Sequence, residues 1–132
     1  MIAVDTNVLA RLVLGDDPRQ VRAAQRLMLQ ARRSGESVYV ADAVLCELVW
    51  VLRSRYKLNR AACASALEAL LDVELIEVDG AAGLESAVRA YAAGRGDFAD
   101  YLIRERSRAA GATEVVTFDR ALKGEQGFRV VG

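Results

Sequence analysis

Ile2-Ala3-Val4-Asp5-Thr6-Asn7 places a short apolar run directly before a carboxylate. A second run, Glu114-Val115-Val116-Thr117-Phe118, is followed in the same way by Asp119. Apolar runs that are too short for a helix and end in a polar residue are typical of strands buried on both faces, in parallel sheets covered by helices. Because α/β proteins bind ligands at the carboxyl ends of such strands, both aspartates are candidates for a binding site.

The rest of the chain alternates between strand-like and helical patterns. Three more strands are expected over residues 38–41, 75–78 and 128–131. Helices are expected over residues 6–14, 17–33, 42–55, 59–71, 80–93 and 97–110, with a short one over 120–123. This alternation, with a single proline in the chain, predicts an α/β domain. We expect three α/β/α layers of Rossmann-like type around a central parallel sheet of about five strands.

Length and composition fit one domain over residues 1–132. With 53% hydrophobic residues, the chain can form a hydrophobic core without needing disulfides or a structural metal. Lys+Arg and Asp+Glu balance at 18 each, so contact with a polyanion requires a local patch. No segment approaches the ~18 uninterrupted apolar residues of a membrane span, and no leader pattern opens the chain. We therefore expect a soluble, cytoplasmic protein that does not enter a membrane.

The cysteine and histidine content limits the possible chemistry. Cys46 and Cys63 lie in apolar helical patterns without C-x-x-C spacing, so we expect reduced core thiols. The chain has no histidine, which excludes the common zinc sets and any Ser-His or Cys-His nucleophile. A catalytic site would therefore depend on carboxylates.

Five acidic residues are candidates for one cluster: Asp5, Glu47, Asp97, Asp100 and Asp119. Clustered carboxylates repel one another and resist ionising together unless a cation lies among them. The set therefore predicts a divalent metal site. The four aspartates also fit a simpler interpretation as exposed helix N-caps, with Asp97 and Asp100 spaced as a capping box.

Glu47 lies within the apolar sequence Val44-Leu45-Cys46-Glu47-Leu48-Val49-Trp50. Burial of an unpaired carboxylate costs several kcal/mol, so we expect it to face either a metal cation or an arginine in a buried salt bridge. The helix from 44 to 52 is apolar on almost every side and includes Trp50. It is expected either in the centre of the core or beneath a protein partner.

The ordered motifs Asp5-Thr6-Asn7, Glu47, Asp97-Phe98-Ala99-Asp100-Tyr101-Leu102-Ile103 and Thr117-Phe118-Asp119 resemble the PIN-domain ribonuclease family, in its VapC-like toxin branch. The resemblance covers essentially the full chain and implies a single PIN domain. It implies an acidic quartet for Mg²⁺ or Mn²⁺ made of Asp5, Glu47, Asp100 and Asp119. It also implies an additional or supporting acid, Asp97, and three polar supports, Thr6, Asn7 and Thr117.

The same resemblance implies an endoribonuclease in which metal-activated water attacks an RNA phosphodiester. Its expected partners are RNA, a cognate antitoxin protein that neutralises the toxin, and a second copy of the chain in a homodimer. One residue departs from the family pattern: Asp42 stands where serine or threonine is frequent, at the start of the helix that carries Glu47.

A phospho-acceptor signalling domain is the alternative from another class, since it is also a small parallel α/β domain with acids at strand ends. Only Asp79 and Lys123 are loosely placed for it, and the first strand supplies one acid instead of two. We otherwise interpret Asp79, Asp16 and Asp17 as solvated turn residues.

Two nucleotide or phosphate chemistries fit poorly. Gly94-Arg95-Gly96-Asp97-Phe98-Ala99 matches the dinucleotide fingerprint G-x-G-x-x-A, but a helical pattern precedes it where that fingerprint requires a strand. A haloacid-dehalogenase-like phosphatase would require a second aspartate at the position of Asn7.

Overall fold

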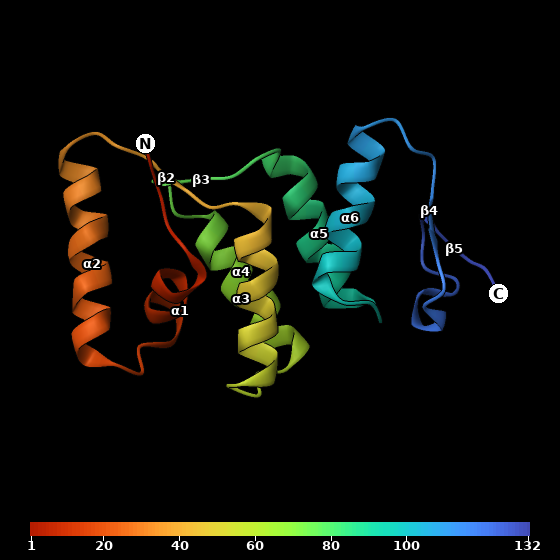
Figure 1. Ribbon diagram of the computed structural model, residues 1–132, viewed down its shortest axis with the longest axis horizontal. Helices are drawn as coiled ribbons and strands as arrows, with labels where there is room; N and C mark the ends of the chain where they lie inside the picture. Colours follow the sequence, from red (N-terminus) through yellow and green to blue (C-terminus); the bar gives the residue numbers. More distant parts are fainter. The chain divides into compact units, whose positions relative to one another are not determined.

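The computed structural model describes all 132 residues, which form two compact units, Met1–Asp79 and Gly80–Gly132 (Figure 1). The first contains β1 (Ile2–Ala3), α1 (Thr6–Leu14), α2 (Pro18–Arg33), β2 (Val38–Tyr39), α3 (Asp42–Ser54), α4 (Arg60–Leu71) and β3 (Ile76–Glu77). The second contains α5 (Ala81–Ala93), α6 (Phe98–Ala109), β4 (Val115–Thr117), the 3-10 turn η1 (Arg120–Leu122) and β5 (Phe128–Val130).

In the first unit the strands form a parallel sheet of order β1-β2-β3. Ile2 pairs with Val38, and Val38 pairs with Ile76. Helix α1 packs against α2 and α3, and α3 packs against α4. The side chains buried between these elements include Val4, Leu9, Val38, Val40, Leu45, Leu48, Leu52 and Leu67.

Polar caps set the helix boundaries of the first unit much as the sequence predicts. The Asp17 carboxylate accepts from the first backbone amides of α2, with Pro18 at the first helical position. Asn59 caps α4 through the Ala62 amide. The expected cap by Asp42 is wrong: Asp42 is the first residue of α3, and Ala41 holds the cap position without a side-chain bond.

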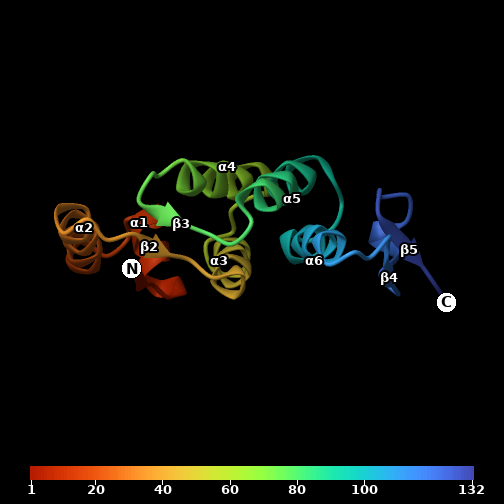
Figure 2. The ribbon, with the colours of Figure 1, turned by 90° about the horizontal axis from the view of Figure 1, so that it is seen from above.

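In the second unit α5 and α6 lie side by side (Figures 1 and 2), and α6 contacts β4. Strands β4 and β5 pair in parallel, with Val115 opposite Phe128. The Tyr101 and Phe128 rings meet edge to face at 6.0 Å, which ties α6 to β5. The buried side chains of this unit include Leu84, Val88, Tyr91, Phe98, Tyr101, Leu102 and Leu122.

The α/β class and the parallel pairing are confirmed. The five strands form one sheet of three and one of two, and each strand is only two or three residues long. Burial on both faces is wrong for β1, where Ala3 is exposed, and for β4, where Val116 is 51% exposed while Val115 and Thr117 take the covered side of the strand. One domain over residues 1–132 stays a prediction.

Two further expectations concern the thiols and the membrane. Both cysteines are free, with Cys63 buried and Cys46 half-buried. Burial, followed by the charge of Asp42, raises the pKa of the Cys46 thiol, which makes it a poor nucleophile at neutral pH. None of the helices combines the length and apolar character needed to cross a membrane.

Candidate functional site

Asp5 lies where the chain leaves β1 and enters α1. Its side chain caps α1, with Oδ1 accepting from the Val8 amide at 3.3 Å. Thr6 is buried, at 5% exposure, whereas Asp5 and Asn7 are exposed. The cap interpretation is confirmed for Asp5, and because the cap occupies one carboxylate oxygen, the second can still bind a cation.

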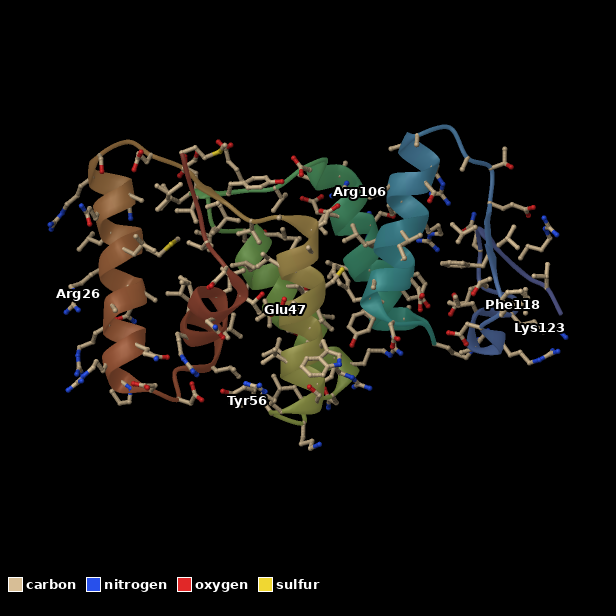
Figure 3. All side chains as sticks on the ribbon, viewed as in Figure 1. Arg26, Glu47, Tyr56, Arg106, Phe118 and Lys123 are labelled. Atoms are coloured by element: carbon tan, nitrogen blue, oxygen red, sulfur yellow. The ribbon has the colours of Figure 1, made fainter.

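Glu47 lies on α3 but not in the core (Figure 3). Helical periodicity turns Leu45, Leu48 and Leu52 inward, so Glu47 faces outward even though its sequence neighbours are apolar. It forms no ion pair with an arginine, so both the expected burial and the buried salt bridge are wrong. Trp50 is 62% exposed, so α3 has one buried and one open face.

Asp97 and Asp100 begin α6 as a capping box. Asp97 is the N-cap, and its backbone N–H donates to Oδ2 of Asp100 at 2.8 Å. Asp97 is exposed and Asp100 is half-buried. The two carboxylates are therefore held at one helix N-terminus, where the helix dipole favours negative charge.

Asp119 follows β4 and caps η1, with Oδ1 accepting from the Ala121 amide at 2.9 Å. The Asp119 amide donates to Oγ1 of Thr117 at 3.0 Å. Thr117 therefore fixes the backbone from which the Asp119 carboxylate extends. This geometry is compatible with the supporting role that the family resemblance implies for Thr117, which stays a prediction.

Three acids of the second unit act on one another electrostatically. Burial raises the pKa of Asp100, and the negative charges of Asp97 and Asp119 raise it further, against a lowering by the Asp97 amide. None of the three forms an ion pair with arginine or lysine. The fold therefore brings the Asp119 charge, from the end of β4, into the field of the α6 N-terminus.

The five candidate acids are divided between the two units. Asp5 and Glu47 belong to the first unit, and Asp97, Asp100 and Asp119 to the second. No three cysteine, aspartate or glutamate side chains are close enough to hold a metal ion. The donor chemistry nevertheless fits, because all five offer carboxylate oxygens, the ligands that Mg²⁺ and Mn²⁺ prefer. Convergence of all five acids stays a prediction.

Sequence reasoning missed a buried polar network that anchors α6. Glu105 is 7% exposed and accepts from Ser86 Oγ at 2.9 Å and from an Arg104 Nη at 3.0 Å. The other Arg104 Nη donates to the Gln126 carbonyl at 3.0 Å. Helical spacing could have indicated this network, since Arg104 and Glu105 lie one helical turn after the buried Tyr101.

Two aspartates interpreted as solvated turn residues have specific partners. Asp16 pairs with Arg11 at 2.7 Å and accepts from the Tyr56 hydroxyl at 2.6 Å. The Tyr39 hydroxyl donates to Asp79. Both aspartates are exposed and lie outside helices and strands, as expected, but each also accepts a hydrogen bond from a tyrosine hydroxyl distant in the sequence.

Comparison with known proteins agrees with the ordered acidic motifs. The PIN domain family matches residues 2–124. The chain is also 30% identical over 131 residues to the VapC ribonuclease of Aquifex aeolicus, covering 99% of this chain and 96% of that protein. The family predicted from the motifs is confirmed: this chain belongs to the PIN-domain family, in its VapC-like branch.

Proposed function

We propose that the protein is a toxin endoribonuclease that cleaves RNA phosphodiester bonds with a bound Mg²⁺ or Mn²⁺. The observation that carries the proposal is the capping box that holds Asp97 and Asp100 together at the start of α6, where the negative charge of Asp119 also acts to raise the pKa of Asp100. Membership of the PIN-domain family and similarity to a VapC ribonuclease support a nuclease. A cation among the three acids would relieve their mutual repulsion.

Asp5, Glu47, Asp100 and Asp119 would hold the metal, with Asp97 as an additional or supporting acid. Each capping bond leaves the carboxylate a second oxygen, so capping and metal binding are compatible. The caps also fix side-chain directions before the cation arrives, which lowers the entropic cost of binding it.

A bound divalent cation supplies a water of lowered pKa and offsets charge on the phosphate. The chain's own residues orient the carboxylates. Val8 and Ala121 donate backbone amides to Asp5 and Asp119, and Thr117 Oγ1 accepts from the Asp119 amide. No histidine is required as a base, in agreement with the composition.

The direct test is RNA cleavage by purified protein. We expect cleavage with Mg²⁺ or Mn²⁺, inhibition by EDTA, and loss of cleavage in Asp5→Ala with the fold intact. Asp17→Ala is the matched control, because it also removes the aspartate cap of a helix but lies outside the quartet. Cleavage by Asp5→Ala at the wild-type rate would refute the proposal.

The family does not favour the phospho-acceptor alternative, and neither does the setting of Asp79. Its carboxylate accepts a hydrogen bond from Tyr39, which leaves it less available as an acceptor of a phosphoryl group. We expect no label from a small phosphodonor such as acetyl phosphate. Labelling that disappears in Asp79→Asn would favour the signalling function instead.

We assign the open face of α3, which carries Trp50, to a cognate antitoxin acting in the cytoplasm with the toxin. A 62% exposed tryptophan offers a large apolar contact of the kind that dominates protein interfaces. Trp50→Ala should weaken capture by a co-expressed antitoxin, encoded in a short neighbouring reading frame, without reducing free toxin activity. Unchanged capture would show that the antitoxin binds a different surface.

We also propose that the protein forms a homodimer. Light scattering tests this and should give twice the mass of one chain; the mass of a single chain would refute it.

A further inference from the structure

The Gly94-Arg95-Gly96 segment, which resembles part of a dinucleotide fingerprint, packs against the start of α6 and the region after η1. A Cβ on Gly94 would overlap the Tyr101 hydroxyl and lie 2.7 Å from Glu125 Oε1. A Cβ on Gly96 would lie 2.5 Å from Leu122 Cδ2 and 3.2 Å from Asp100 Oδ2. The glycines are therefore explained by close backbone approach rather than by a nucleotide.

Hydrogen bonds join this segment to two side chains. The Gly96 amide donates to the Tyr101 hydroxyl at 3.0 Å, and the Arg95 amide donates to Glu125 Oε1 at 2.8 Å. The Tyr101 hydroxyl in turn donates to the same Glu125 oxygen at 2.9 Å. Tyr101 is fully buried, so this triangle is a fixed part of the second unit.

The Arg95 side chain extends the network to the turn that Asp119 caps. Its guanidinium donates to the Lys123 carbonyl at 2.6 Å and to the Ala121 carbonyl at 3.3 Å. The Glu125 amide donates to the Leu122 carbonyl at 3.0 Å. Lys123 ends this turn (Figure 3). Arg95 and Glu125 therefore hold η1 against the loop that leads into Asp97.

We propose that Arg95, Tyr101 and Glu125 form a brace that positions the Asp119 carboxylate relative to Asp97 and Asp100. They are positioning residues, since none of them needs to touch metal or RNA. The inference rests on the proposed function, because the spacing of those three acids matters only if they share a cation.

The test compares full-length Tyr101→Phe and Arg95→Ala with wild type by amide hydrogen exchange in metal-free protein. The informative amides are Asp97, which donates to Asp100, and Ala121, which donates to Asp119. Mn²⁺ affinity is then measured by calorimetry well below the unfolding temperature. Tyr56→Phe is the matched control, since it also removes a hydroxyl bonded to a carboxylate, that of Asp16.

We expect Tyr101→Phe and Arg95→Ala both to accelerate amide exchange at Ala121 and Asp97. Both should also weaken Mn²⁺ binding roughly 10-fold or more, the usual effect of removing a group that orients a metal ligand. Tyr56→Phe should change neither. Arg95→Lys should restore part of the affinity, because an ammonium can still donate to a carbonyl. Exchange at Ala121 and Asp97 equal to wild type in both variants would overturn the brace. Wild type that fails to bind Mn²⁺ would refute the proposed function, while the exchange result still decides the brace.

Discussion

Glu105→Ala tests the polar network that anchors α6. Glu105 and Arg104 are 7% and 8% exposed, and Arg104 Nε already has no hydrogen-bond partner. Removing the Glu105 carboxylate takes away the ion-pair partner of the Arg104 guanidinium and leaves it buried with the Gln126 carbonyl, the Tyr101 and Phe128 rings and the more distant charge of Glu125. Loss of one partner of a buried pair costs about 3–5 kcal/mol.

The expected fall in Tm follows from chain length. At about 2.1 cal/mol/K per residue, 132 residues give an unfolding entropy of about 0.28 kcal/mol/K. A loss of about 3–5 kcal/mol then lowers Tm by about 11–18 °C. Thermal unfolding followed by circular dichroism measures this shift directly.

Glu114→Ala is the matched control for Glu105→Ala. Glu114 also pairs with an arginine of the second unit, Arg129, at 2.7 Å, but the two side chains are 41% and 56% exposed. Such a surface pair contributes at most about 1 kcal/mol, so its Tm should fall by no more than about 4 °C. Equal shifts for Glu105→Ala and Glu114→Ala would refute the argument that burial makes the Arg104–Glu105 pair matter.

Three further outcomes can be measured on the same protein. Because burial and the charges of neighbouring acids raise the pKa of Asp100, ionising it opposes folding; Asp100→Asn should raise Tm at pH 7, with the gain absent below the ordinary aspartate pKa of about 4. Burial opposes ionisation of Glu105, but hydrogen bonds from Ser86 and Arg104 and nearby arginine charge lower its pKa overall; the Tm advantage of wild type over Glu105→Gln should hold at neutral pH and disappear as pH falls below about 4.3 and through the folded pKa. Gly94→Ala should strongly lower Tm, since its Cβ would lie 2.8 Å from the Ala90 carbonyl. Gly83→Ala, within α5, would meet only ordinary contacts with Arg106 and Glu105 of α6 and should raise the free energy of unfolding by up to about 1 kcal/mol. A neutral Gly94→Ala, an unchanged Asp100→Asn Tm, or a Glu105→Gln difference that persists in acid would each contradict its argument.

Local chemistry made the helices predictable from the sequence. Asp5, Asp17, Asn59 and Asp97 each precede a helix, and the structure places all four at N-caps. Asp42 misled because a capping residue and a first-turn acid look alike without backbone angles. Strand positions were predictable from short apolar runs, but their lengths and the division into two sheets depend on pairing that no local pattern contains.

The candidate site was predictable in its residue types but not in its burial. Glu47 shows why: an apolar neighbourhood in sequence does not imply one in space, since helix rotation places successive residues on different faces. The brace escaped notice for a related reason. Arg95 and Tyr101 lie 30 and 24 residues before Glu125, and only the tertiary packing shows that both donate to one oxygen of Glu125.

A double-mutant cycle on Mn²⁺ affinity tests most directly whether acids from both units bind one cation. Calorimetry on wild type, Asp5→Asn, Asp119→Asn and the double variant gives the coupling between Asp5 in the first unit and Asp119 in the second. We predict that each single change weakens binding and that the two effects are not additive, as for side chains that share a ligand. Unchanged affinity in Asp5→Asn, or strictly additive losses, would contradict a shared metal site.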